Sequence, residues 1–220
     1  MKIGVAIFPG SNCDTDALHA VELIGATPVE LWHADADLKN VDAIIVPGGF
    51  SYGDYLRPGA IARFDAVMGE VERFAREGGP VLGVCNGFQV LTEAHLLPGA
   101  LLQNMSMRYV CRKVPVRVEA TDTPWTANCG AGEEFSLPVA HNEGNYFADA
   151  DTLARLEDEG RVVLRYLENP NGSANDIAGV CNEGRNVVGI MPHPERVSDN
   201  ALGSDEGLKI LRSVLVGAGV

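Results

Sequence analysis

Short runs of apolar residues alternate with helical patterns through the first half of the chain. Four runs have the length and composition of buried strands, and they cover residues 3–8, 28–32, 43–46 and 81–84. Between them, apolar residues that recur every three or four positions predict helices over residues 14–24, 59–76 and 87–95. The first helix ends at Gly25 and the second at Gly78, because glycine is favoured just after a helix. Repeated strand–helix–strand units predict a parallel sheet with right-handed crossovers.

The second half of the chain has a different pattern, with strand-like runs joined by turn-rich loops. These runs cover residues 114–120, 137–141, 162–167, 177–180 and 187–191. Helical patterns are confined to residues 151–158 and 206–216. We therefore expect antiparallel strands to extend the sheet, followed by a C-terminal helix. No internal repeat, linker or low-complexity segment divides the sequence, so a single domain over residues 1–220 is expected.

Composition narrows the classes of function. Acidic residues outnumber basic ones by 30 to 17, and a nucleic-acid-binding protein would need basic surface to neutralise phosphates. The five cysteines form an odd set without CxxC or Cys–His metal spacing, so neither a disulfide framework nor a structural zinc site is expected. No apolar run approaches the roughly 20 residues of a membrane span, and the first residues resemble a buried strand instead of a signal peptide. We expect a cytoplasmic protein with no membrane or nucleic-acid partner.

The segment around Cys85 carries the clearest chemical signal. An apolar strand runs into Gly-x-Cys-x-Gly at residues 83–87, and a helical pattern follows at once. This is the cysteine form of the nucleophile elbow, a sharp strand-to-helix turn that exposes the nucleophile above the sheet. The start of the helix favours a thiolate at Cys85, and the backbone N–H of Asn86 is placed to stabilise an oxyanion. A free cysteine is often simply buried, but the glycine frame favours a nucleophile here.

A cysteine nucleophile needs a base, and His193 stands out among the five histidines. It lies in Pro192-His193-Pro194-Glu195, where the prolines predict an extended segment. Residues two apart in an extended segment face the same way, so Glu195 can accept a hydrogen bond from one ring nitrogen of His193. The other nitrogen is then free for the thiol. Strands of a parallel sheet end at one edge, which can bring His193 to Cys85; without Cys85 the same run fits an ordinary turn equally well.

These motifs together resemble the class I glutamine amidotransferases, whose signature is Gly-x-Cys-x-Gly-x-Gln with a late His-Pro-Glu. Further runs are similar to one group in that family, the small glutaminase subunits of phosphoribosylformylglycinamidine synthases. Those runs are FPGSNCD at 8–14, PGGFSYGDYLR at 47–57, QNMSMRY at 103–109, NPNGS at 169–173 and DIAG at 176–179. The resemblance spans nearly the whole chain. It implies a three-layer, flavodoxin-like α/β domain with a mostly parallel central sheet flanked by helices.

The resemblance also implies a role for each residue of the site. Cys85 would be the nucleophile, His193 the base and Glu195 the residue that orients the base. Six further residues would contact glutamine or stabilise its oxyanion: Gly48, Gly49, Phe50, Asn86, Gln89 and His141. The loop that begins at His141 is usually written His-Gly-Glu-Gly in the family, and Asn142 replaces its first glycine. Since asparagine tolerates left-handed backbone angles, this difference leaves only the detail of the loop open.

The reaction and the partners follow from the same resemblance. The chain would hydrolyse L-glutamine through a cysteine thioester and deliver ammonia to a large synthetase subunit, with a small third subunit bridging the two. No lysine-containing P-loop occurs, so no cofactor is expected on this chain, and ATP and magnesium are expected on the synthetase. Two alternatives stay open. One is an elbow-cysteine peptidase or deglycase, which usually has a histidine where Asn86 stands; the other is a non-catalytic subunit on the same fold.

Overall fold

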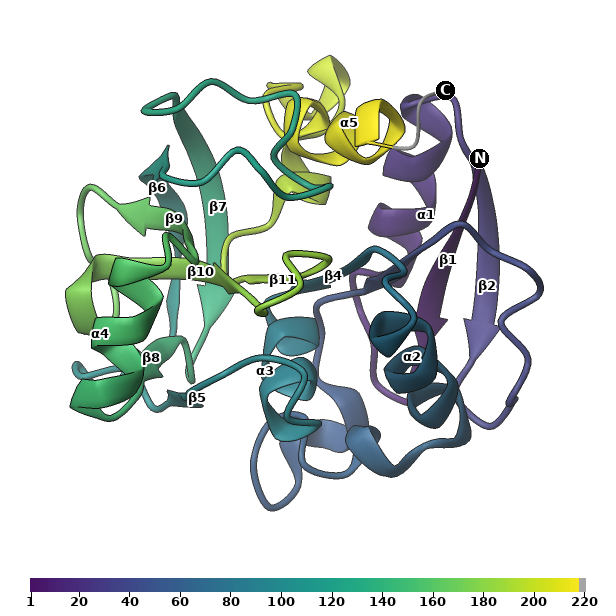
Figure 1. The fold of residues 1–220 in the computed structure, drawn as a ribbon, viewed down its shortest axis with the longest axis horizontal. Coiled ribbons are helices and arrows are strands. Elements are labelled where there is room, and N and C mark those ends of the chain that lie inside the picture. Colours follow the sequence, from purple (N-terminus) through teal and green to yellow (C-terminus); the bar gives the residue numbers. More distant parts are fainter. Residues whose placement is uncertain (218–220) are drawn as a thin grey trace.

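The computed structural model describes residues 1–217, and within them nine strands form one large sheet. Their bounds are β1 Lys2–Ile7, β2 Thr27–Trp32, β3 Ala43–Val46, β4 Val81–Val84, β6 Val110–Val118, β7 Glu134–His141, β9 Val162–Tyr166, β10 Ile177–Cys181 and β11 Val187–Ile190. The order across the sheet is β2-β1-β3-β4-β11-β10-β9-β6-β7 (Figure 1). Strands β2 to β11 in this order are parallel, and β10, β9, β6 and β7 continue the sheet antiparallel. The predicted α/β class, parallel core and antiparallel extension are confirmed.

Helices cover both faces of the parallel strands. The bounds are α1 Asp14–Leu23, α2 Ala66–Arg76, α3 Asn86–Glu93, α4 Ala150–Asp158 and α5 Leu208–Gly217. Helices α1 and α5 contact each other on one face, and α2 and α3 lie on the opposite face (Figure 1). Helix α4 lies beside the antiparallel strands, where a small second sheet pairs β5 Ala100–Leu102 with β8 Asn145–Phe147. The sequence patterns did not predict this second sheet.

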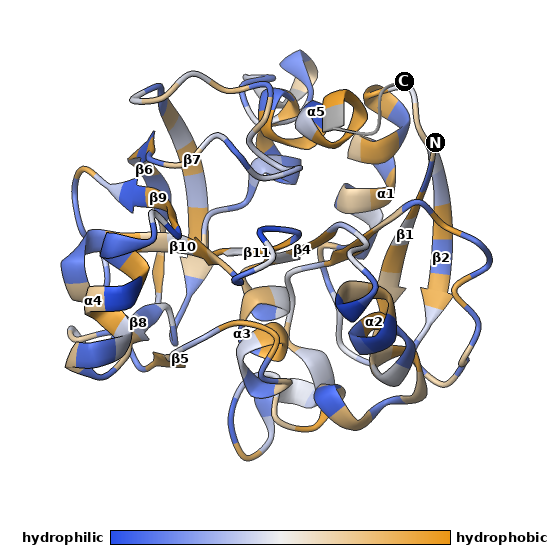
Figure 2. Cartoon of the chain, in the orientation of Figure 1, coloured by the Kyte–Doolittle hydropathy of each residue, from blue (hydrophilic) through white to orange (hydrophobic). Residues whose placement is uncertain are grey.

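The core lies between the sheet and its covering helices. All four residues of β3 and all four of β4 are buried, as continuous apolar strands covered on both faces should be. Figure 2 shows the same division by hydropathy, with apolar colour along the central strands and polar colour on the outer sides of α2 and α4. The sequence could reveal these strands because their burial leaves no room for polar positions.

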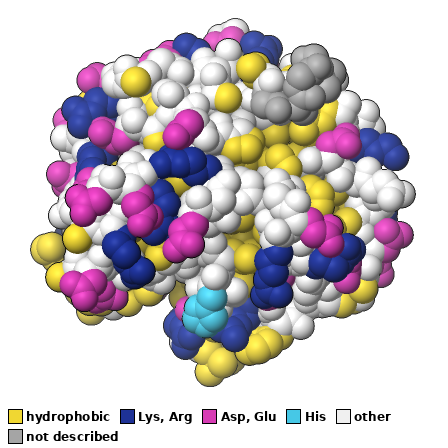
Figure 3. All heavy atoms as spheres, viewed as in Figure 1, with side chains coloured by type: hydrophobic (Ala, Val, Ile, Leu, Met, Phe, Trp, Pro, Cys, Tyr) yellow, Lys and Arg dark blue, Asp and Glu magenta, His cyan; other side chains and the backbone are white. Residues whose placement is uncertain are grey.

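The surface mixes charges of both signs. On the face shown in Figure 3, acidic and basic side chains are interspersed instead of gathered into one broad basic area. Among the helices of residues 1–217, none combines the length and the apolar character needed to cross a bilayer.

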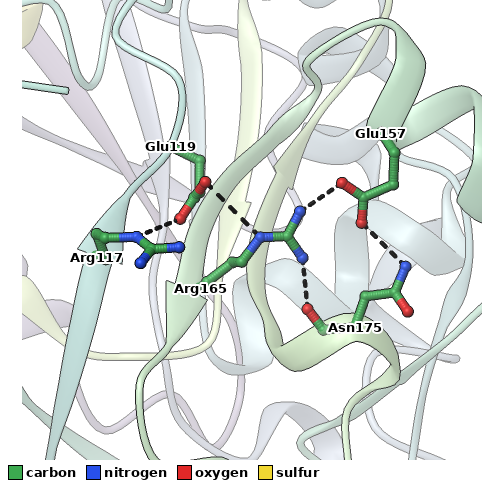
Figure 4. Close-up of polar contacts among 5 residues, drawn as sticks. All are labelled: Arg117, Glu119, Glu157, Arg165 and Asn175. Carbon is green, nitrogen blue, oxygen red and sulfur yellow. Dashed lines mark hydrogen bonds and ion pairs between the residues drawn. The ribbon is translucent and has the colours of Figure 1, made fainter. Parts of the chain in front are cut away.

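A network of charged side chains ties α4 to the antiparallel strands (Figure 4). Arg165 on β9 pairs with Glu157 of α4 and donates to the carbonyl oxygen of Asn175. On its other side it faces Glu119, which also accepts a 2.7 Å hydrogen bond from Arg117. Asn175 in turn donates to Glu157 over 2.9 Å. One mostly buried arginine thus joins a helix, two neighbouring strands and a loop.

The single helix predicted over residues 59–76 is wrong. The structure has a 3-10 turn, Ala62–Phe64, and then α2, separated by Asp65 in an extended conformation with ψ 152°. The Asp65 carboxylate accepts a 2.8 Å hydrogen bond from the hydroxyl of Tyr52. Aspartate favours helix starts over helix interiors, so the break falls there. Phe64, one of the apolar residues whose spacing predicted that helix, is 75% exposed.

The assignment of residues 187–191 to the antiparallel extension is also wrong in part. Strand β11 pairs antiparallel with β10, but it pairs in parallel with β4, with Val187 beside Val81 and Ile190 beside Val84. It therefore lies in the centre of the sheet, and all four of its residues are buried. Because β4 and β11 run side by side in one direction, the residues that follow them emerge at the same edge.

Candidate active site

Cys85 occupies the turn between β4 and α3. Its backbone has φ 50° and ψ −104°, a conformation that a non-glycine residue rarely adopts and that is found where a site over-determines it. Glycines on both sides allow the close approach of strand and helix. A Cβ on Gly83 would lie 2.7 Å from the carbonyl oxygen of Gly87, and one on Gly87 would overlap the carbonyl oxygen of Val46. The nucleophile elbow predicted from the sequence is present.

The central strands bring His193 to this turn. The backbone N–H of Cys85 donates to the carbonyl oxygen of Ile190 over 2.8 Å, so the ends of β4 and β11 are held together. His193 follows β11 after two residues, and its own N–H donates to the carbonyl oxygen of Pro138 over 2.9 Å. The thiol of Cys85 lies 3.7 Å from the carbonyl oxygen of Ala140, on the same strand β7. The base and the nucleophile are thus fixed by the ends of β4 and β11 and by contacts with the edge strand β7.

Glu195 contacts the imidazole as predicted, but by a different local geometry. His193 itself is extended, with φ −103° and ψ 91°, whereas Pro194–Val197 forms a 3-10 helix that begins directly after it. The prediction of an extended run through Glu195 is therefore wrong, because proline is well suited to the first position of a helical turn. The turn carries the Glu195 carboxylate back to His193, with 2.6 Å between Oε1 and Nδ1. Both side chains are buried.

The electrostatics of His193 favour its charged form. Burial alone would lower its pKa, but the charges of Glu195 and Cys85 outweigh burial and raise the pKa well above the ordinary value. Nδ1 donates to Glu195, and Nε2 is buried without a hydrogen-bond partner among residues 1–217. An imidazolium held in this way can pair with a thiolate and then give up a proton from Nε2.

The loop after β3 lies against the same imidazole. A Cβ on Gly48 would lie 2.6 Å from Cε1 of His193, so only glycine leaves room for the ring. Gly49 has φ 141°, and a side chain there would strike the backbone at Asn12, 2.6 Å away. The N–H of Phe50 already donates to the carbonyl oxygen of Gly10 over 3.0 Å. The resemblance predicts that Gly48, Gly49 and Phe50 contact glutamine. At the first two of these positions a side chain would collide with neighbouring atoms, which explains the glycines.

Asn86 and Gln89 lie on the first turns of α3 and bond to each other. The Asn86 amide donates to Oε1 of Gln89 over 2.9 Å, and its Oδ1 accepts the backbone N–H of Ser51 over 3.2 Å. Nε2 of Gln89 donates to the carbonyl oxygen of Glu143 over 2.6 Å. These two amides thus tie the loops at Ser51 and Glu143 to the helix that begins directly after Cys85.

His141 has a different environment from His193. Nδ1 lies 3.0 Å from Oδ1 of Asn104, and Nε2 lies 3.5 Å from Nδ2 of Asn171. Burial, together with the charge of His193, lowers the pKa of His141 to about 4. The ring is therefore neutral near pH 7, and it joins the loops at 104 and 171 to the end of β7.

Comparison with known proteins gives the family. A family model described as a CobB/CobQ-like glutamine amidotransferase domain matches residues 1–206. A Rubrobacter xylanophilus protein named phosphoribosylformylglycinamidine synthase subunit PurQ is 80% identical over 220 residues, which is all of both chains. The Koribacter versatilis protein of the same name is 55% identical and covers 99% of this chain and 98% of its own. The chain belongs to the PurQ family of glutamine amidotransferases. The family resemblance predicted from its motifs is confirmed.

Solved structures agree with this family assignment. A chain of the PurLQS structure from Thermotoga maritima superposes with a TM-score of 0.91 and 44% identity, covering 99% of this chain and 98% of the other. Another glutamine amidotransferase from Thermotoga maritima has 14% identity and a TM-score of 0.61, covering 98% of this chain and 96% of its own; it shares the fold.

Cys13 is a residue of this site that sequence reasoning did not connect with His193. One ligand atom from each of Cys13, His193 and Glu195 falls within 4.8 Å of the others, an arrangement that could hold a thiophilic metal ion. Such an ion would compete for the imidazole that the triad uses. Cys13 and His193 also border a cavity of about 240 Å³ that Asp16 and Arg196 help to line. Only the fold joins position 13 to position 193, so residue spacing carries no signal of this contact.

Proposed function

We propose that this chain is the glutaminase subunit of phosphoribosylformylglycinamidine synthase. It hydrolyses L-glutamine to glutamate and ammonia and passes the ammonia to a synthetase subunit, which makes formylglycinamidine ribonucleotide from formylglycinamide ribonucleotide and ATP. One observation carries the proposal: a buried His193–Glu195 pair stands at the elbow of Cys85 in a chain 80% identical to a PurQ protein. Fold alone would leave the activity open.

The triad residues each have one task in this mechanism. The thiolate of Cys85 attacks the carboxamide carbon of glutamine and forms a tetrahedral oxyanion. The imidazolium of His193 donates its Nε2 proton to the departing nitrogen, which leaves as ammonia, and a glutamyl thioester remains. His193, now neutral, takes a proton from water, whose oxygen attacks the thioester carbonyl. The C–S bond breaks, glutamate leaves and Cys85 returns as thiolate beside imidazolium.

Backbone N–H groups stabilise the oxyanion. Since Phe50 N–H is already bonded to Gly10, we assign this role to Gly49 and to Asn86, the first residue of α3. Asn86 lies where the helix dipole also favours negative charge. Phe50, Gln89 and His141 complete the glutamine pocket in this proposal.

The rest of the complex supplies what this chain does not. The large synthetase subunit binds ATP and magnesium, and a small third subunit bridges it to this chain. The PurLQS structure from Thermotoga maritima supports such an assembly by its high similarity to this chain. Residues 1–220 act as one domain, and the complex works in the cytoplasm.

Glutamate release from L-glutamine tests the proposal. The chain is assayed alone and then with the large and small partner subunits, formylglycinamide ribonucleotide, ATP and magnesium. Mixing should stimulate release at least tenfold, and Cys85→Ala should abolish it, a loss of roughly 10³-fold or more. The Cys129→Ala variant is the control, because it removes a buried thiol near Ser213 instead of the one at the elbow. Stimulated release that survives Cys85→Ala would overturn the proposal. Complete absence of release by the folded wild-type complex would favour the elbow-cysteine alternatives.

A further inference from the structure

A second cavity lies at the edge of the sheet opposite to Cys85 and His193. Its volume is about 500 Å³, within the range of roughly 300–1,000 Å³ that is usual for small-molecule sites. Its walls come from the end of α2, the chain after α3, helix α4 and the turn between β10 and β11 (Figure 1). The triad follows the ends of the parallel strands β4 and β11, whereas this cavity is bordered by the segments that precede their first residues. The cavity is therefore separate from the candidate active site.

Three arginines border this cavity, although the chain as a whole has a net charge of −13. Arg76 ends α2, Arg155 lies on α4 and Arg161 follows that helix. Arg76 pairs with Glu72 over 2.9 Å, but no carboxylate within residues 1–217 pairs with Arg155, which donates to a hydroxyl of its own helix over 3.2 Å. Among the lining residues Glu183 alone is acidic. The lining thus has an excess of positive charge.

Arg161 is the buried member of this set, with a side chain that is only 7% exposed. Its backbone is fixed, because its N–H donates to the carbonyl oxygen of Leu156 over 2.8 Å and its own carbonyl oxygen accepts the N–H of Cys181 over 3.0 Å. Nε lies 2.7 Å from Oε2 of Glu159, but in a direction that makes no hydrogen bond. No other group within residues 1–217 accepts a hydrogen bond from this guanidinium. Buried arginines are nearly always bonded, so these donors call for a ligand with acceptor oxygens.

The number of arginines favours a phosphate over a carboxylate as that ligand. A phosphate monoester has three terminal oxygens and a charge of about −1.5 to −2 at pH 7, whereas a carboxylate has two oxygens and a single charge. An arginine fork binds two phosphate oxygens at once, and three segments of the chain each supply such a fork here. Leu97 and Pro98 add apolar surface to the lining, and Glu183 can accept hydrogen bonds from hydroxyl groups. The ligand should therefore carry a hydroxylated organic part as well as the phosphate.

We propose that this cavity binds a small phosphate ester, such as a sugar phosphate or a mononucleotide, through the guanidinium groups that border it. The phosphate supplies acceptors for the unbonded donors of Arg161 and the countercharge that Arg155 lacks. Charge-assisted hydrogen bonds of this kind are among the strongest that proteins make. The inference goes beyond the proposed glutaminase function and does not rest on it, because no residue of the triad lines this cavity.

Isothermal titration calorimetry of the full chain with ribose 5-phosphate tests the inference, since this compound is the unit that nucleotides and many sugar phosphates share. One site per chain with a dissociation constant below about 1 mM is expected. Ribose and citrate should bind at least about tenfold more weakly, because the first lacks the phosphate and the second offers only carboxylates. Arg155→Gln should weaken binding of ribose 5-phosphate by about tenfold or more, and Arg161→Gln should weaken it further because the lost contact is buried.

Arg155 is exposed, so its replacement carries little risk to the fold. Arg112→Gln is the matched control: it removes a half-exposed arginine of β6, outside the cavity, and should leave the affinity within about twofold of wild type. Absence of saturable binding to the wild-type chain would overturn the inference. So would wild-type affinity in Arg155→Gln, or an equal loss in Arg112→Gln, which would indicate general attraction of anions instead of a site. Citrate binding as tight as that of ribose 5-phosphate would assign the cavity to carboxylates, such as an acidic segment of a partner protein. Glutamate release is not measured, so failure of the proposed function would leave this result unaffected.

Discussion

Within the triad, Glu195 acts on the chemistry only through His193. Its carboxylate is 2.6 Å from Nδ1 and holds the proton there, which leaves Nε2 for the reaction. The pair is buried, so its interaction is weakly screened by solvent or salt. The negative charge of Glu195 and that of Cys85 keep the pKa of His193 above its ordinary value in spite of burial. A change at Glu195 should therefore appear first as a change in pH dependence.

Glu195→Gln keeps the shape of the side chain and removes its charge. Without the carboxylate, burial should lower the pKa of His193, since an opposite charge at this distance is worth about 1–3 pH units. The imidazolium is then lost at lower pH, so the alkaline limb of kcat/KM should move toward acid by about 1–3 units. The pH–rate profile of the complex measures this, because kcat/KM reports groups of the free enzyme. An alkaline limb that stays in place would show that Glu195 does not set the charge of His193.

The same shift links pH to stability. A histidine whose pKa is raised in the folded state stabilises the fold at pH values below its unfolded pKa of about 6.5. That contribution is lost as pH rises through the folded value. In Glu195→Gln it should be absent, so urea unfolding at pH 6 and pH 9 should differ less in the variant than in the wild type.

At the residue scale, the sequence identifies the triad but not its surroundings. Cys85, His193 and Glu195 are found because each lies in a local motif of glycines or prolines, and in the structure His193 lies beside both Cys85 and Glu195. Their catalytic roles, and the binding roles of the loop residues, stay predictions. Cys13 lacks such a local signal. It lies beside His193 because of the order of the strands, which residue periodicity does not encode.

At the element scale, the buried strands were the most predictable part. Strands β3 and β4 match their predicted bounds, and β1 and β2 differ from theirs by one residue, because strands covered on both faces are continuously apolar. At the break, Asp65 accepts a hydrogen bond from Tyr52, which is distant in sequence, and the parallel pairing of β11 depends on its neighbour β4. Such tertiary contacts override local pattern, which explains both errors.

The packing of α3 on β3 gives a prediction at this scale. In Gly87→Ala the new methyl group would overlap the carbonyl oxygen of Val46, so helix and strand must separate. Overpacking of this kind costs about 1–3 kcal/mol, more than the roughly 0.5–1 kcal/mol that alanine gains over glycine within a helix. The free energy of unfolding should fall, and glutaminase activity with it, because α3 begins directly after Cys85.

Gly69→Ala is the matched control for that experiment. Gly69 lies within α2 and is exposed, and a Cβ added there would meet no atom within 4 Å. Alanine is more favourable than glycine within a helix, and at position 69 no steric clash offsets this gain. The free energy of unfolding should therefore rise by about 0.5–1 kcal/mol with unchanged activity. Urea denaturation of both variants measures these changes in the free energy of unfolding. Equal stabilisation by both would contradict the close contact assigned to Gly87.

At the scale of the whole molecule, exposed apolar side chains gather at one edge of the sheet. Strands β3, β4 and β11 end at this edge, and β6 begins there, so it also holds Cys85 and His193. The loops along it expose seven large side chains: Phe50, Tyr55, Leu56, Phe64, Met105, Met107 and Tyr109. Apolar surface of this kind marks interaction sites. A partner that covers it would also enclose the active site and receive the ammonia.

Leu56 tests this arrangement with little risk to the fold. The side chain is 87% exposed on a backbone with φ 67°, where leucine is strained and asparagine is tolerated. Leu56→Asn should leave the free energy of unfolding unchanged or raise it by up to about 1 kcal/mol. It should weaken binding of the synthetase subunit by about tenfold or more, since a large apolar contact is lost. At saturating synthetase, kcat for glutamate release should return to the wild-type value.

The matched control is Lys39→Asn, an exposed residue with φ 53° that precedes β3 and so lies toward the opposite edge of the sheet. It relieves the same backbone strain without changing the apolar edge, and synthetase affinity should not change. Titration of each variant with the synthetase subunit, read by stimulated glutamate release, gives both apparent affinity and maximal rate. Wild-type affinity in Leu56→Asn would place the synthetase elsewhere on the surface. Its stimulation of glutamate release would then have to be transmitted to Cys85 through the domain. Weaker affinity with an intact maximal rate would mean that the edge which carries the triad is also the edge that recognises the synthetase.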